Sequence, residues 1–160
     1  MAGVLHFGRQ HTNHKDFSGL FWQISWETWR KNAPQSILRM GNVHINVAEF
    51  LAALITCETF SAFVKERITT LALDNVTAKA WIDSARCTRH PYDRCAQGSH
   101  LYMLKHSMKI RTKWVPSEAN VLADECSRKV YSRSRLGHII SGARLKRVSP
   151  RWQNVLRFCK

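Results

Sequence analysis

The spacing of apolar and polar residues predicts an alternation of strands and helices along the chain. An aromatic and β-branched run at 20–26, LFWQISW, predicts a strand. The polar residues 27–36 predict a loop, and a short strand, SILRM, is expected at 36–40. From His44 onward, apolar residues recur at helical spacing through INVAEFLAALITCETFSAFVKE, with no Gly or Pro. This segment is the clearest helix prediction in the sequence.

The second half continues the alternation. The pattern predicts a strand at 68–73, a helix through VTAKAWIDSA, a loop at 87–99, a helix at 99–108, a strand at 109–115, a helix at 119–129 and a short helix around Trp152 to Phe158. Strands that alternate with helices are typical of a mixed sheet flanked by helices. The sequence therefore predicts an α/β (α+β) fold.

The length and charge of the chain narrow this picture. A chain of 160 residues suits one compact core, which we place at 1–130. No acidic residue follows Glu125, so 131–160 is expected to form a basic C-terminal arm. The formal charge is +14, with 25 Lys and Arg against 11 Asp and Glu, which favours a polyanionic partner, foremost nucleic acid. A basic surface without a dedicated ligand and a phospholipid surface are the weaker alternatives.

The cysteines and the apolar runs bear on location. Five scattered cysteines do not form the even framework of a small secreted domain, which favours a reducing compartment. The first residues lack the apolar core of a signal peptide, and no apolar run reaches membrane-spanning length. The sequence thus predicts an intracellular protein of the nucleus or cytoplasm, not secreted and without a membrane partner.

Three carboxylates occupy positions that call for an explanation. Asp74 stands where an apolar strand ends and a helix begins, which suits either a helix cap or a site residue. Glu49 interrupts an otherwise apolar helix, and Asp124 follows Val121-Leu122-Ala123 in another. A buried carboxylate needs a cation, hydrogen-bond donors or exposure. The plainer alternative for the last two is a half-exposed carboxylate paired with Lys or Arg.

Three sequence blocks resemble a known family. HINVAEFLAAL, LALDNVTAKAWI and TKWVPSEANVLADECSR resemble, in order and spacing, the signatures of the ribonuclease H domain of reverse transcriptases. The most similar group is that of retroelements with tyrosine recombinases, the DIRS/Ngaro group and its kinetoplastid members. Together the blocks span about residues 44–129. The resemblance implies a ribonuclease H-like fold with a mixed five-stranded sheet flanked by helices.

The resemblance also implies a two-metal endoribonuclease that cleaves the RNA strand of RNA–DNA hybrids. Two Mg²⁺ or Mn²⁺ ions, about 3.5–4 Å apart, would be held by four carboxylates, namely Asp16, Glu49, Asp74 and Asp124. Asp16 would bridge the ions, Glu49 and Asp74 would complete the nucleophile side, and Asp124 would hold the second ion. Asp16 matches the family's first-strand motif through Asp16-Phe17-Ser18. If residues 4–8 form the first strand instead, Asp16 falls in a turn and the quartet is incomplete.

Contacts to nucleic acid follow from the same resemblance. Asn75 and Thr77 would contact the 2′-hydroxyl groups that distinguish RNA from DNA. Asn120 or Glu118 would stand in for a histidine that many relatives use in product release. Phosphate contacts are expected from four basic residues, Arg128, Lys129, Arg133 and Arg135. The expected partners are the hybrid and an upstream reverse transcriptase domain of the same polyprotein.

Other interpretations remain open at the level of sequence. A catalytically degenerate ribonuclease H-like module that binds RNA or scaffolds a ribonucleoprotein would keep the fold without the activity, and a transposase or integrase core would use a similar acidic site on DNA. The spacing of Cys87, His90, Cys95 and His100 also matches a zinc knuckle, although the ligand order is unusual. Five tryptophans are expected to serve in packing rather than base stacking: Trp22, Trp26, Trp29, Trp81 and Trp114.

Overall fold

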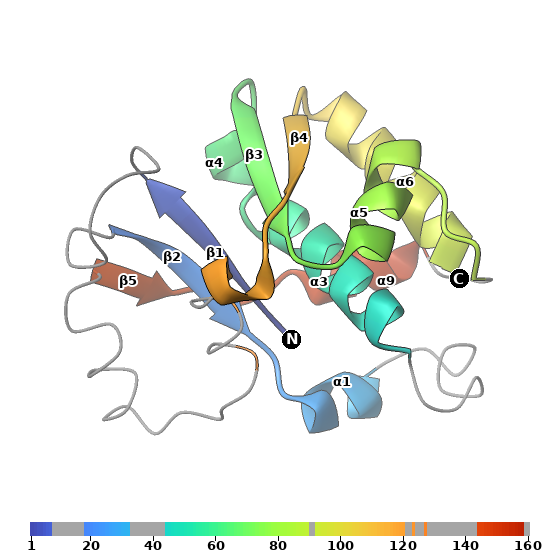
Figure 1. The fold of residues 1–160 in the computed structure, drawn as a ribbon, viewed down its shortest axis with the longest axis horizontal. Coiled ribbons are helices and arrows are strands. Elements are labelled where there is room, and N and C mark those ends of the chain that lie inside the picture. The colour runs from blue at the N-terminus through green and yellow to red at the C-terminus, as the bar shows by residue number, and fades with distance from the viewer. Residues whose placement is uncertain are drawn as a thin grey trace.

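A computed structural model shows a mixed α/β fold built around one long helix (Figure 1). The structure describes residues 1–7, 18–32, 44–89, 92–120, 123, 127 and 144–158. The strands are β1 (Ala2–Phe7), β2 (Ser18–Gln23), β3 (Ile68–Leu73), β4 (Lys109–Trp114) and β5 (Arg144–Arg147). The helices are α1 (Trp26–Asn32), α3 (Ile45–Thr59), α4 (Ser61–Val64), α5 (Val76–Ser84), α6 (Tyr92–Lys105) and α9 (Trp152–Arg157), with a 3₁₀ turn, η2, at Ser117–Ala119.

The described strands form two sheets. In the first, β2 lies between β1, which is antiparallel to it, and β5, which is parallel to it. In the second, β3 and β4 pair in parallel, with Ile68 opposite Lys109 and Leu73 opposite Trp114. The mixed α/β class is confirmed. The expected single five-stranded sheet is not what these residues form, because neither β1 nor any other described strand pairs with the second edge of β3.

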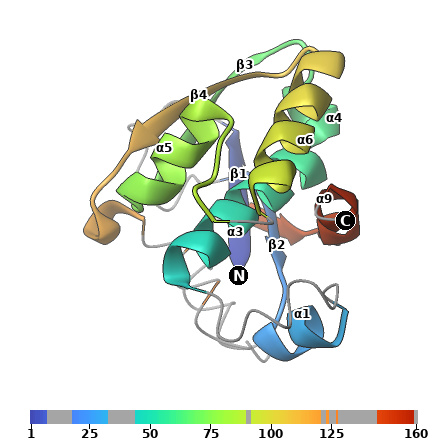
Figure 2. The ribbon, with the colours of Figure 1, turned by 90° about the vertical axis from the view of Figure 1, so that its right-hand side faces the viewer.

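Helix α3 lies in the middle of the molecule, with α5 and α6 on one side of it and the sheet of β1, β2 and β5 on the other (Figures 1 and 2). Most of its large apolar residues are almost fully buried, among them Phe50, Leu51 and Ile55, whereas Ile45 at its start is 61% exposed. The ring of Phe50 meets that of Trp81 on α5 edge to face, with the centroids 5.7 Å apart. This pair fixes α5 against the first half of α3.

Several predicted elements are confirmed within one or two residues. These are β3, α5, β4, the closing helix α9 and the long helix from residue 45, which is interrupted at Phe60 between α3 and α4. The alternative first strand at 4–8 is also confirmed in outline, since β1 spans Ala2–Phe7. The predicted strand at 36–40 lies outside the described residues, as does most of the predicted helix at 119–129.

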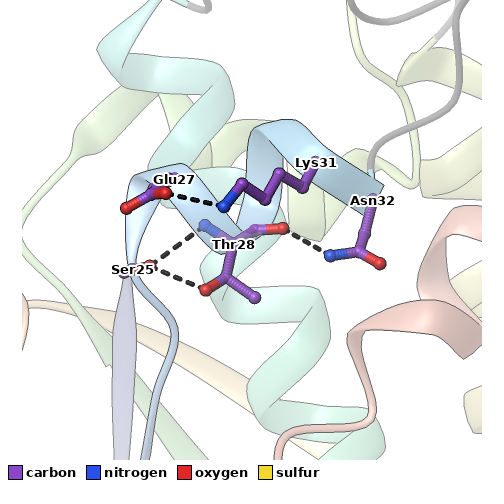
Figure 3. A network of polar contacts seen from close by, with 5 residues as sticks. All are labelled: Ser25, Glu27, Thr28, Lys31 and Asn32. Carbon is purple, nitrogen blue, oxygen red and sulfur yellow. Dashed lines mark hydrogen bonds and ion pairs between the residues drawn. The ribbon is translucent and has the colours of Figure 1, made fainter.

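The predicted loop after β2 is wrong, because residues 26–32 form α1. Figure 3 shows the contacts that make this helix. The Ser25 hydroxyl accepts a hydrogen bond from the Thr28 backbone N–H at 3.0 Å, Lys31 pairs with Glu27 at 2.7 Å, and the Asn32 amide donates to the Thr28 carbonyl. Trp29 is buried on its inner side, edge to face with Trp152 at 6.2 Å.

The predicted loop at 87–99 is also wrong in its second half, because α6 already begins at Tyr92. Gly98 suggested a loop, yet it stands in the middle of this helix. A Cβ atom at this position would meet the ring of Phe158 at 2.5–2.6 Å, too close for a side chain. Glycine is therefore required for the close approach of the C-terminal residues, not for a turn.

The described part of the expected basic arm contributes to the core of the fold. β5 pairs with β2, and α9 packs against α3 and α6. Val155 of α9 is 1% exposed and belongs to the same apolar cluster as Phe50 and Trp81. The described residues from 144 to 158 thus complete the first sheet and pack on α3.

Candidate functional site

Asp74 lies directly after β3, at the point where the chain turns into α5. The strand ends because its apolar alternation stops at Leu73, and the helix starts because Asn75 caps it: the Asn75 Oδ1 accepts from the Ala78 N–H at 2.8 Å. Asp74 is therefore not the cap of α5. Its carboxylate makes no hydrogen bond or ion pair with any residue that the structure describes, and it is half-exposed.

The backbone of Asp74 is nevertheless held firmly. Its carbonyl oxygen accepts a hydrogen bond from the indole Nε1 of Trp114 at 3.1 Å, and the Val115 N–H donates to the Leu73 carbonyl at 2.9 Å. These bonds join the ends of β3 and β4. Trp114 is 49% exposed, so the expectation that it serves in core packing is wrong, whereas Trp22, Trp29 and Trp81 are buried as expected.

Glu49 lies on the first half of α3, half-buried and beside Phe50. One helical turn before it, the Asn46 Oδ1 accepts a hydrogen bond from the Asn75 Nδ2 at 2.9 Å. Because residues three apart on a helix share a face, this bond brings the Glu49 face of α3 to the end of β3 that carries Asp74. The structure thus places two of the four predicted carboxylates on adjoining elements.

The other two predicted ligands, Asp16 and Asp124, lie outside the described residues. The first described strand, Ala2–Phe7, contains no acidic residue. Among the residues that are described, no group of three or more His, Cys, Asp or Glu side chains converges in a way that suits a metal ion. The described part of the proposed site is therefore the pair Glu49 and Asp74.

A nearby carboxylate shows how a structural acid differs from Asp74. Asp83, near the end of α5, pairs with Lys79 at 2.6 Å and accepts a hydrogen bond from the Thr112 hydroxyl of β4. Partial burial opposes its ionisation, but the bonds from Lys79 and Thr112 and the Lys79 charge outweigh it and lower the pKa of Asp83. Asp83 links α5 to β4 through a hydrogen bond, whereas the Asp74 carboxylate forms no such bond with a described residue.

The predicted nucleic-acid contacts are placed in part. Asn75 uses its Oδ1 in the cap and one amide hydrogen in the bond to Asn46, and its other amide hydrogen has no acceptor among the described residues. Thr77 is half-buried in the first turn of α5, and Asn120 is half-buried after η2. Four further predicted contacts lie outside the described residues: Arg128, Lys129, Arg133 and Arg135.

Sequence reasoning missed Asn46. It belongs to the first turn of the predicted long helix, where a polar residue is ordinary and does not indicate a site. Its role depends on Asn75, which is near it only in the folded chain. A signal was available in the two blocks HINVAEF and LALDNVT, because Asn46 stands one helical turn before Glu49 and Asn75 directly follows Asp74.

The zinc alternative loses one ligand. Cys95 is disulfide-bonded, so its sulfur is not available as a thiolate ligand, and His90 lies outside the described residues. Cys87 is a buried free thiol whose pKa is raised, mainly by burial.

Two further observations complete the description. Within the residues that the structure describes, no helix has the length and apolar character needed to cross a membrane. No protein-family model matches the chain, and no curated protein or solved structure is significantly similar to it.

Proposed function

We propose that the chain is a metal-dependent endoribonuclease of the ribonuclease H type, which cleaves the RNA strand of RNA–DNA hybrids. The observation that carries the proposal is the carboxylate of Asp74, fixed at the end of β3 through its backbone and left without a partner among the described residues, beside the Glu49 face of α3. A site acid needs this combination of a rigid backbone and an available carboxylate.

The chemistry of the pair suits a hard divalent cation. Carboxylate oxygens are the ligands that Mg²⁺ and Mn²⁺ prefer, and Mg²⁺ is commonly held by one or two carboxylates together with water and substrate phosphate. When bound, such ions lower the pKa of the attacking water and stabilise the charge on the leaving oxygen. Within the described residues, Glu49 and Asp74 would hold the ion. Asp16 and Asp124 complete the predicted set of four.

Three features of the chain support nucleic acid as the substrate class. The net charge of +14 favours a polyanion, and the three sequence blocks resemble the ribonuclease H domain of retroelement reverse transcriptases. The order of β3, α5 and β4, with Asp74 at the first junction, also agrees with that resemblance. An upstream reverse transcriptase domain of the same polyprotein remains part of the proposal.

The test is cleavage of an RNA–DNA hybrid labelled on the RNA strand, in Mg²⁺ and in Mn²⁺. The wild-type chain should cleave the RNA strand. Asp74→Asn should lower the rate about a hundredfold or more, because several kcal/mol of charge stabilisation are lost, and should leave hybrid binding normal or tighter. Asp93→Asn is the matched control, since among the described residues Asp93 accepts hydrogen bonds from the Cys87 N–H and the Gln97 amide. Intact hybrid with wild-type protein in both metals would contradict the proposal.

One observation favours a second candidate, a ribonuclease H-like module that binds nucleic acid without cleaving it. The opening strand β1, Ala2–Phe7, contains no Asp or Glu, although the family's first ligand lies on its opening strand. In that case wild-type protein and Asp74→Asn would bind the hybrid equally, and neither would cleave it.

A further inference from the structure

The outer face of the β3–β4 sheet carries a row of cations. Along β4, Ile110 and Thr112 face α5 and the core, since Ile110 packs on the apolar cluster and Thr112 bonds to Asp83. The alternate residues Lys109, Arg111 and Lys113 therefore point away from the helices, and all three are exposed. We refer to these three residues as the β4 basic row.

The neighbouring strand β3 provides no counter-charge to the β4 basic row. On β3 the residues opposite Lys109, Arg111 and Lys113 are Ile68, Thr70 and Ala72, each exposed and none acidic. The side chains of the row have no ion pair or hydrogen bond with any residue of the described ranges. Three like charges that repel one another and lack counter-charges favour an anionic partner.

The geometry of the row fits a linear polyanion. Alternate residues of a parallel strand are about 6.6 Å apart, so the row is about 13 Å long. One strand of a duplex carries a phosphate about every 3.4 Å along the axis, so a row of this length spans about four phosphates. Interfacial amphipathic helices bind phospholipid surfaces through several apolar anchors, and among the described residues of this face Ile68 is the one large apolar side chain.

The row also leads to the candidate site. Lys113 precedes Trp114, whose indole N–H donates to the Asp74 carbonyl, and Leu73 pairs with Trp114 at the end of the sheet. We propose that the β4 basic row binds the phosphate backbone of the nucleic acid that reaches the Asp74 edge. The proposal rests on the proposed function only for the identity of that nucleic acid.

The test compares two triple variants with equal loss of charge. Lys109→Gln/Arg111→Gln/Lys113→Gln removes the row, and Arg86→Gln/Arg89→Gln/Arg157→Gln removes three exposed charges beyond α5 and on α9. Binding of a labelled RNA–DNA hybrid is measured in EDTA, so that cleavage plays no part, between about 50 and 200 mM salt. Thermal melting of both variants establishes that they are folded.

The affinity of the wild-type chain and of the control variant for the hybrid should fall steeply with salt concentration. The affinity of the row variant should fall less steeply. Three phosphate contacts contribute about 2.7 to the slope of log affinity against log salt, so over a fourfold change in salt the row variant should lose about 40-fold less affinity than wild type. A row variant with the salt slope of the control overturns the proposal. So does a row variant that aggregates with an unchanged slope, since this would assign the row to protection of the sheet edge.

Two outcomes keep the proposals distinct. If the salt dependence of hybrid binding is reduced in the row variant while wild-type protein fails to cleave the hybrid in Mg²⁺ and Mn²⁺, the phosphate-binding role of the row is supported and the nuclease proposal fails. If wild-type protein cleaves the hybrid and the row variant binds it as the control variant does, the nuclease proposal is supported and the phosphate-binding role of the row is contradicted. If the row variant loses binding to phosphatidylserine vesicles but not to the hybrid, the row binds a lipid surface instead, and the proposal is overturned.

Discussion

The two ends of α3 use their polar residues in different ways. At the C-terminal end, Glu58 is 4% exposed, and its Oε1 accepts a hydrogen bond from the Asn154 amide at 2.8 Å. The Arg151 N–H donates to the Thr59 hydroxyl at 3.0 Å beside it. These bonds hold the segment that leads into α9 against α3. Every one of these polar groups is committed to the fold.

At the N-terminal end the same helix is held mainly by the apolar contact of Phe50 with Trp81. Polar bonds add to it, among them those from Asn75 to Asn46 and from the Asn46 N–H to His44, and the Asp74 carboxylate stays without a described partner. A buried polar group without a partner destabilises a fold, whereas a half-exposed one costs little. The C-terminal end of α3 is therefore stabilised by hydrogen bonds to the buried Glu58 and Thr59, whereas the N-terminal end can keep an available acid because apolar packing stabilises it.

Trp81→Ala should have the largest effect on stability. Trp81 is 8% exposed, and its removal deletes the ring that packs on Phe50 and leaves a cavity under the candidate site. We expect a loss of about 3–5 kcal/mol in the free energy of unfolding, measured by urea denaturation. A loss near 1 kcal/mol would show that apolar packing does not hold the N-terminal end.

Glu58→Ala should destabilise the fold by about 1–3 kcal/mol, because the half-buried amide of Asn154 is left without its acceptor. Asp74→Asn serves as the matched control, and its free energy of unfolding should change by no more than about 0.5 kcal/mol. Equal losses in the two variants would remove the distinction between a structural and an available carboxylate. Chemical denaturation of both proteins in metal-free buffer provides the comparison.

Asn75→Ala should cost about 0.5–2 kcal/mol through the loss of the cap of α5 and of the bond to Asn46. A double-mutant cycle with Asn46→Ala separates the two effects, since only the second depends on Asn46. We expect an interaction energy of at least about 0.5 kcal/mol between the two residues. Strict additivity would mean that this bond does not couple α3 to the end of β3.

Asp83→Asn should have the smallest effect, and one that depends on pH. The folded pKa of Asp83 is lowered, so its ionised form contributes stability above the unfolded pKa, and this contribution is lost as the pH falls through the folded value. Because the pair is largely exposed, we expect less than about 1 kcal/mol. Thermal melting at pH 7 should separate variant from wild type, and at a pH below the folded pKa the difference should vanish.

Much of the fold could be predicted from the sequence, because many of its helices and strands are determined by residues close together in the chain. β3 and α5 were found from an apolar run, the polar break at Asp74-Asn75 and the helical spacing after it. Helix α1 was missed because Trp29 is buried against Trp152, far along the chain. The start of α6 was missed because Gly98 makes room for Phe158, which no local pattern reveals.

The candidate site was predicted less completely than the fold. Asp74 was singled out correctly as a junction residue, but the sequence left open whether it or its neighbour caps α5, and the structure assigns the cap to Asn75. The contact between Asn46 and Asn75 was not foreseen, because it depends on how α3 packs against α5. The roles of Asp16 and Asp124 stay predictions.

The most direct test of the central claim, that the Asp74 edge binds a divalent cation, is Mn²⁺ titration followed by amide signals in nuclear magnetic resonance. The paramagnetic ion should broaden the amides of Asn46, Glu49 and Asp74 first, and Asp74→Asn should shift this broadening to higher Mn²⁺ concentration. Broadening that begins elsewhere, or that is the same in wild type and Asp74→Asn, would contradict the account.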